Sequence, residues 1–284
     1  MRNFRFLQPE DIPSVLKIKQ DEQSRAHILA GGTNLISYIK IGQVKQGVLI
    51  DITRISDMKQ VKEEEGKVSI GAGVTIKELI DNALVQRKLP GFWETLFLFA
   101  NPLIRNKATI GGNLADASPI ADTAPILLAL DAEVVAESSG ANRVIPLKDF
   151  FTGPGTTVLK GEEVVTRVMV PCFASSKVKM LKMGLRNGTA CSVTSVAVRL
   201  DIDGAVKEAR VALGGVAPTP MRSKSCEEKL SSMELNRKTI EAAAGAVLQD
   251  ICPISDVRGT AEYRNGISVP MTRKALSIAA GVEV

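Results

Sequence analysis

In the first 55 residues, short continuous apolar runs alternate with segments whose apolar residues recur at helical spacing. Apolar runs at 4–6, 26–30 and 47–52 predict three strands. Between the first two, apolar residues recur at helical spacing over 12–18, behind Asp11, a suitable N-cap. A second helix is predicted at 35–39. The pattern indicates a small β-α-β-α-β subdomain that ends near residue 55.

Residues 56–173 carry a second set of predicted elements. The charged segment KEEEGK at 62–67 is typical of a solvated hairpin, and Thr75 and Glu78 have the spacing of a capping box. A long helix is expected at 119–130, with Ser118 as N-cap, because the missing N–H of Pro119 costs nothing at the first helical position. Further strands are predicted at 68–70, 133–136 and 143–146, and in a run that ends at Pro171.

The pattern changes after a small polar linker at 172–178. Longer strands are predicted at about 178–186, 192–202 and 206–216, and Asp203-Gly204 between the last two is a strong hairpin signal. Helices are predicted at 237–250 and about 259–281. The C-terminal part therefore reads as a separate unit.

Two adjacent-glycine segments carry the candidate chemistry. AHILAGGTNLI (26–36) and the segment that begins ATIGGN (108–113) each join an apolar approach to a predicted helix. Paired glycines let a backbone pass close to a ligand and direct N–H groups at a phosphate. A simple tight turn is the competing interpretation. Gly71-Ala72-Gly73 is not a Rossmann fingerprint, because a third glycine and a following acidic strand end are missing.

Composition excludes several function classes. The 284 residues are 45% hydrophobic and 24% charged, and no apolar run approaches the about 20 residues of a membrane span. A cytoplasmic location is expected, because the N-terminus lacks a signal-peptide pattern. The net charge of +5 is dispersed and aromatics make up only 4%, so nucleic-acid binding is not expected. Four separated cysteines argue against a metal site in this chain, and the single histidine, His27, excludes a convincing Ser-His-Asp triad.

The motifs AGGTNL and TIGGNL, with SPIAD after the second, resemble the FAD-binding subunit of the molybdenum hydroxylases, the family of xanthine dehydrogenase and carbon monoxide dehydrogenase. The stretches ALGGVAPTPMRS and ICPISDVRGTAEYR resemble the C-terminal domain of the same flavoproteins. The resemblance implies an α+β chain. Its FAD-binding domain of the vanillyl-alcohol oxidase (PCMH) type would cover 1–173, with subdomains at about 1–55 and 56–173. A C-terminal domain at 177–284 would hold a three-stranded antiparallel sheet and helices.

The resemblance also implies a set of cofactor-binding positions. They lie in the two glycine segments, in an aromatic stretch, in the SPIAD motif and in two later strands: Ile28, Leu29, Ala30, Gly31, Gly32, Thr33, Asn34, Leu35, Phe99, Ala100, Thr109, Ile110, Gly111, Gly112, Asn113, Asp122, Val165 and Lys182. The resemblance implies that Asp122 accepts hydrogen bonds from the sugar hydroxyls of the cofactor and that Lys182 lies near the flavin ring. The alternative for Asp122 is a carboxylate in the first turn of a helix.

In relatives, an aspartate usually stands in the segment that follows the lysine matched by Lys182 and an arginine. In this chain the corresponding segment, Arg186–Ala190 (RNGTA), contains no acid. This departure leaves the electron acceptor open. No protein acid or base is required, because the flavin itself performs the chemistry. FAD is expected to be non-covalent, because the only histidine precedes the first loop and no cysteine lies near either loop in the sequence.

The resemblance implies the flavin link of an oxidoreductase complex. Molybdopterin would reside on a large partner subunit and 2Fe–2S centres on a small one, and electrons would pass to NAD+ or another acceptor. A free-standing flavoprotein oxidase and a flavin-free scaffold subunit are the alternatives. The first would need a catalytic acid/base constellation, which the C-terminal hundred residues do not show. The intact glycine pairs disfavour the second.

Overall fold

The computed structural model describes residues 3–186 and 188–283. The first sheet has the parallel order β1-β3-β2, with β1 at Phe4–Leu7, β2 at Ala26–Leu29 and β3 at Gly47–Asp51. Helices α1 (Ile12–Glu22) and α2 (Leu35–Lys40) connect these strands. Asp11 caps α1, because its side chain accepts a hydrogen bond of 2.8 Å from the Ser14 N–H. The predicted β-α-β-α-β order is confirmed.

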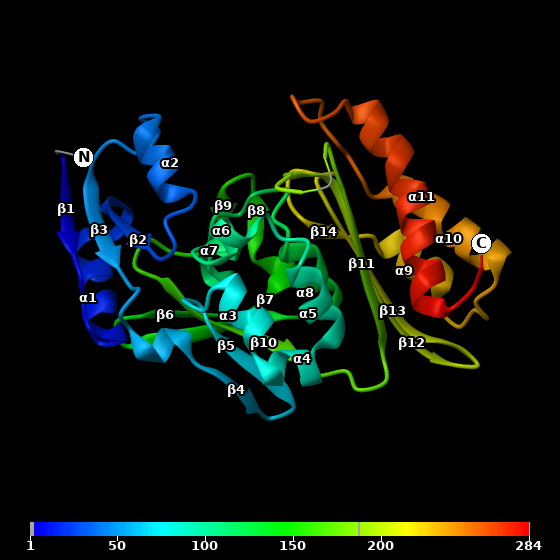
Figure 1. Cartoon of the computed structure of the whole chain (residues 1–284), viewed down its shortest axis with the longest axis horizontal. Coiled ribbons are helices and arrows are strands. Elements are labelled where there is room, and N and C mark those ends of the chain that lie inside the picture. The colour runs from blue at the N-terminus through cyan, green and yellow to red at the C-terminus, as the bar shows by residue number, and fades with distance from the viewer. Residues whose placement is uncertain (1–2, 187, 284) are drawn as a thin grey trace.

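The second sheet is antiparallel and forms the middle of the molecule (Figure 1). Its order is β4 (Val61–Glu64), β5 (Lys67–Gly71), β10 (Val164–Pro171), β6 (Glu133–Ser138) and β7 (Ala141–Pro146). The predicted hairpin joins β4 to β5 through Glu65 and Gly66, both at positive φ. Between β7 and β10 in the sequence, β8 (Phe151–Gly153) and β9 (Thr156–Thr157) form a separate two-stranded sheet. Short 3-10 turns occur at Gln23–Arg25, Ser56–Lys59, Leu147–Asp149 and Val247–Gln249.

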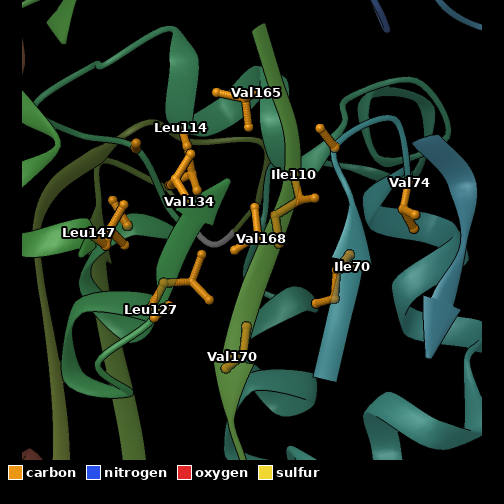
Figure 2. Packing of buried hydrophobic residues seen from close by; sticks show 14 of the residues in the cluster. Ile70, Val74, Ile110, Leu114, Leu127, Val134, Leu147, Val165, Val168 and Val170 are labelled. Carbon is orange, nitrogen blue, oxygen red and sulfur yellow. The ribbon is translucent and has the colours of Figure 1, made fainter. Parts of the chain in front are cut away.

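Buried aliphatic side chains meet around β10 in the core of this middle layer (Figure 2). Val168 and Val170 of β10 lie among Ile70 of β5 and Val134 of β6. Complete burial of one such side chain contributes about 1.5–3 kcal/mol. The helices of this layer are α3 (Ile76–Asp81), α4 (Ala83–Lys88), α5 (Pro90–Leu96), α6 (Pro102–Arg105), α7 (Ile110–Ala115) and α8 (Ala124–Ala129). Thr75 and Glu78 form the predicted capping box of α3.

The structure corrects two predictions around the second glycine pair. The expected helix at 119–130 begins only at Ala124, with Thr123 as its N-cap, so the assignment of Ser118 as N-cap is wrong. Residues 118–121 form a turn instead, closed by a 3.0 Å bond from the Ala121 N–H to the Ser118 carbonyl. Gly111 and Gly112 lie inside α7 rather than in a strand-to-helix turn, because the Thr109 hydroxyl caps that helix.

The C-terminal part is an antiparallel sheet covered by helices. The three predicted strands are present as β11 (Lys177–Gly184), β12 (Ser192–Asp203) and β13 (Ala205–Gly214), and the two-residue β14 (Met221–Arg222) makes the sheet four-stranded. The turn between β12 and β13 is Gly204, at φ +68°. The helices are α9 (Lys224–Leu230), which the sequence did not predict, α10 (Arg237–Ala246) and α11 (Ala261–Ala280). No helix in the described ranges has the length and apolar character needed to cross a bilayer.

An ion-pair cluster, here called the Asp131 cluster, joins α8 to the C-terminal sheet. Asp131 accepts from Arg199 Nη2 at 3.1 Å, from Arg210 Nε at 2.9 Å and from Arg222 Nη1 at 2.9 Å. Arg199 is only 1% exposed, and its guanidinium carbon lies 3.6 Å from the ring centroid of Phe173 in the linker. The cluster therefore fixes the C-terminal sheet to the middle layer and to the linker.

Asp131→Asn should lower the free energy of unfolding by about 1–2 kcal/mol, because Arg199 loses one acidic partner but keeps Glu208 at 2.5 Å, and the Asp131 side chain is 32% exposed. Asparagine tolerates the positive φ of 47° at this position, so the change tests charge rather than backbone strain. Denaturant unfolding measures the effect. Asp203→Asn, in the exposed Asp203–Lys207 pair, is the control and should leave the midpoint unchanged. Equal midpoints for both variants would show that the cluster contributes no stability.

Candidate functional site

A cavity of about 670 Å³ lies where the three parts of the molecule meet. Its walls come from β2, the first glycine segment and α2 on one side, and from α7 and the connection between α5 and α6 on the other. Leu159, Lys160 and residues 163–165 line it from the segment that leads into β10, and residues 189–191 line it from the connection between β11 and β12. The volume lies within the about 300–1,000 Å³ typical of ligand pockets.

The first glycine segment offers unpaired backbone donors to the cavity. The N–H groups of Gly31, Gly32, Thr33 and Asn34 donate to no other described residue, although all four residues line the cavity. Gly32 has a φ of +68°, a conformation that glycine adopts without steric cost but that strains a β-branched residue. Consecutive unpaired N–H groups form a concave site that suits an anion.

Gly31 also permits contact between the two walls. A Cβ at Gly31 would lie 1.8 Å from the Lys107 carbonyl oxygen, so no side chain fits there. On the other wall, a Cβ at Gly111 would lie 2.4 Å from the Ala72 Cβ, whereas one at Gly112 would meet only the Thr109 Oγ1, at 2.8 Å. Gly31 and Gly111 therefore serve packing, and Gly112 is the glycine whose missing side chain leaves room in the cavity.

On the second wall, most backbone N–H groups near the glycine pair are already hydrogen-bonded within the protein. The N–H groups of Ile110 and Gly111 donate to the carbonyls of Val74 and Ala72, both at 3.0 Å, and the Gly112 N–H donates to the Thr109 hydroxyl at 3.1 Å. Asn113 uses its carbonyl oxygen to accept from the Thr123 hydroxyl at 2.6 Å. Its amide NH₂ donates to no described residue, so the side chain can present a donor from this wall.

Asp122 and Lys182 form a partly buried ion pair at the cavity. Lys182 Nζ lies 2.6 Å from Asp122 Oδ2 and also donates to the Leu98 carbonyl at 3.0 Å, while the Ser192 hydroxyl donates to Asp122 Oδ1 at 2.7 Å. The two side chains are 9% and 13% exposed. Asp122 precedes the N-cap of α8, so the first-turn alternative for this carboxylate is wrong. Both carboxylate oxygens are held by groups of the C-terminal sheet.

The predicted positions are brought together around one cavity, with three exceptions. Leu29, Ile110 and Lys182 are not among the residues that line it. Ile110 is completely buried and packs in the core (Figure 2). Lys182 reaches the site only through Asp122. All other predicted cofactor-binding positions line the cavity.

Several lining residues escaped sequence reasoning because they come from distant segments. Glu163, at the start of β10, is held by a bidentate Arg143 at 2.7 and 2.8 Å, and this hydrogen bonding lowers the pKa of Glu163. Burial lowers the pKa of Lys19, which donates to the Gln23 and Ala26 carbonyls. Further missed lining residues include His27, Tyr38, Asp116, Leu159, Lys160, Val164, Thr189, Ala190 and Cys191.

No cysteine lies near the glycine loops in the sequence, but the fold brings one cysteine to the cavity that these loops line. Cys191 is distant from both loops in the sequence, yet it is exposed and lines the same cavity. His27 lines it as well, and burial lowers the pKa of its imidazole. The cavity thus holds two potential nucleophiles.

Two family models match the chain. The FAD binding domain in molybdopterin dehydrogenase matches residues 2–173, and the CO dehydrogenase flavoprotein C-terminal domain matches residues 179–279. The medium chain of carbon monoxide dehydrogenase from Hydrogenophaga pseudoflava is 31% identical, with coverage of 97% of this chain and 96% of that one. The xanthine dehydrogenase FAD-binding subunit of Escherichia coli O157:H7 is 31% identical, with coverage of 90% and 89%.

The fold agrees with these relatives. A solved carbon monoxide dehydrogenase from Hydrogenophaga pseudoflava, which lacks the Mo-pyranopterin moiety of the molybdenum cofactor, has a chain that superposes with a TM-score of 0.95. The two sequences are 31% identical, and the match covers 98% of each chain. The likeness therefore extends over the FAD-binding and the C-terminal parts together.

Proposed function

The chain belongs to the family of FAD-binding domains of molybdopterin dehydrogenases, and from this premise we propose that it relays electrons within a molybdenum hydroxylase complex. The predicted family, fold class and FAD cofactor are confirmed, and the chain is an oxidoreductase subunit. In the proposal, the molybdenum cofactor resides on a large subunit and 2Fe–2S centres on a small one. The linker at 172–178 is proposed as the boundary between the domains at 1–173 and 177–284.

The unpaired N–H groups of Gly31–Asn34 carry the proposal. They suit a diphosphate, which is an anion too large and too polar for an ordinary apolar pocket. Gly112 on the opposite wall leaves room for the same group. Phe99, Ala100 and residues 189–191 offer mostly apolar surface for the flavin ring, and Val165 offers the same for another part of the cofactor.

The chemistry that bound FAD supplies is electron transfer, from iron–sulfur centres of a partner to NAD+ or another acceptor. The chain's residues bind and orient the cofactor. Lys182 is proposed to stabilise negative charge on the flavin side of the cavity, and its pairing with Asp122 limits that effect to the field of an ion pair. Asp122 is proposed to accept from the sugar hydroxyls in addition to its present donors.

The choice of acceptor depends on the segment 186–190. Thr189 and Ala190 line the cavity, while Asn187 lies outside the described residues. Relatives usually place an aspartate in this segment, and a carboxylate there would make that edge of the cavity more negative. Transfer to NAD+ therefore stays a proposal, with another acceptor as its alternative.

Exposed apolar side chains beside the cavity suit a docked partner subunit. Phe97, Leu98 and Leu103 flank the connection between α5 and α6, and their exposure is 48%, 41% and 79%. Met183 and Leu185 at the end of β11 are exposed too, and the Lys182–Leu98 hydrogen bond holds the two segments together. Such a patch on a soluble domain marks an interaction site. We place the small iron–sulfur subunit here, because electron transfer requires proximity to the flavin.

The bound FAD should be non-covalent despite the presence of His27 and Cys191 in the cavity. His27 precedes the first glycine pair and its imidazole is engaged by a hydrogen bond with the Gln46 backbone, and Cys191 is far from both glycine segments in the sequence. Precipitation of the flavoprotein with acid should leave the yellow colour in the supernatant. Cys191→Ser should behave identically; colour that stays in the wild-type pellet and is released by this variant would prove a covalent link.

Gly112→Val should give a folded, colourless protein. The added side chain meets only the Thr109 hydroxyl within the protein but projects where the cofactor would pass. Gly266→Val is the control, because Gly266, like Gly112, is an exposed helical glycine. Gly266 has open space around it and lies in α11, away from the cavity. Absorbance in the flavin bands per mole of protein measures retention. Stoichiometric flavin in Gly112→Val would refute the proposed cofactor position.

The purified chain alone should take up electrons from a chemical reductant but hydroxylate no heterocycle. The four cysteines are well separated in the sequence, which does not suit iron–sulfur ligation, so this chain is not expected to extract electrons from such a substrate. Assay with an artificial dye as acceptor tests this. Turnover by the single polypeptide would identify a free-standing oxidase, and a colourless wild-type protein that cannot be loaded with FAD would identify a scaffold.

A further inference from the structure

A pair of hydrogen bonds crosses the cavity from one wall to the other. Asp116, at the C-terminal end of α7, accepts from the Asn34 amide nitrogen at 2.7 Å and from the Tyr38 hydroxyl at 3.0 Å. Asn34 follows the first glycine pair and Tyr38 lies in α2, so both donors belong to the opposite wall. All three residues line the cavity. They are here called the Asp116 bridge.

The Asp116 bridge lies toward solvent. Asn34 is exposed, and Tyr38 and Asp116 are half-buried. Burial and the neighbouring carboxylate raise the pKa of Tyr38 to about 12. The phenol therefore keeps its proton at neutral pH and remains a donor to Asp116.

The charge of Asp116 argues against a direct role in holding the cofactor. A carboxylate repels a diphosphate, and the unpaired N–H groups that suit this anion include the N–H of Asn34 itself. Both carboxylate oxygens are instead occupied by donors from the facing wall. The arrangement suits a contact that holds the two walls together rather than one that holds the ligand.

We propose that the Asp116 bridge is a gate that must open for FAD to enter or leave the cavity, an inference that rests on the proposed FAD site. The bridge joins the walls both with and without cofactor and breaks only while the cofactor passes. Loss of the bridge then lowers the barrier in both directions. Association and dissociation accelerate together, and the Kd changes less than either rate.

Tyr38→Phe removes one of the two hydrogen bonds without changing the charge or the ring. In the full-length chain stripped of flavin, association with FAD is followed by stopped-flow quenching of flavin fluorescence. Dissociation is followed by the recovery of that fluorescence on dilution. Both rates should rise about tenfold, the low end of the effect of one hydrogen bond to a charged acceptor. Tyr263→Phe is the matched control, because this second tyrosine lies in α11 and does not line the cavity.

Asp116→Ala removes both hydrogen bonds and also a charge that repels the diphosphate, so faster dissociation, which loss of that repulsion would not produce, is its readout. Tyr38→Phe added to Asp116→Ala should produce no further acceleration, because the two residues act through one contact. A rise in dissociation alone, with a correspondingly weaker Kd, would show direct contact with FAD and overturn the gate. Rates equal to those of Tyr263→Phe would also overturn it while leaving the FAD site intact. Failure of the unsubstituted chain to bind FAD would instead overturn the proposed function.

Discussion

The cavity depends on a backbone contact that admits no side chain. Gly31 meets the Lys107 carbonyl so closely that a methyl group would overlap it, and Gly111 meets Ala72 in the same way on the opposite wall. The contact at Gly31 brings the parallel sheet and the middle layer together, and the adjacent Gly31–Asn34 N–H groups have no partner among the described residues. Close packing at Gly31 and the proposed anion binding at the residues that follow it therefore occur in one short segment.

Helix α8 transmits the position of the C-terminal sheet to the cavity. Asp122 lies just before this helix and Asp131 just after it, and both carboxylates are bound by cations of the C-terminal sheet. Every residue of α8 between them is buried. Buried ion pairs repay their desolvation only in good geometry, so their value here is a fixed register between two layers. One consequence is that Ser192 and Lys182 hold Asp122 in a defined position at the cavity.

Local signals predicted the elements well, and tertiary contacts decided the exceptions. Asp11, the Thr75–Glu78 pair and Gly204 each act within a few residues, and each was identified from the sequence. The segment 110–115 was misjudged, because two glycines disfavour a helix; the Thr109 cap and the bonds to Val74 and Ala72 outweigh this. The glycine segments gave most of the candidate site. Tyr38, Glu163 and Cys191 could not be found, because only the fold brings their segments to one cavity.

The arrangement of charge explains why binding and electron transfer can be adjusted separately. The proposed anion site is built from uncharged backbone donors on the first glycine segment, so no titrating side chain supplies its hydrogen bonds. Three carboxylates at the cavity have partners: Asp122 pairs with Lys182, Glu163 pairs with Arg143, and Asp116 accepts from two neutral donors. The end of the cavity formed by Thr189, Ala190 and Cys191 carries no acidic or basic side chain at these positions. In the proposed function, a substitution at 189–191 would change the potential at the flavin and leave the diphosphate contacts intact. An acidic residue in this segment could therefore be gained or lost without loss of the cofactor.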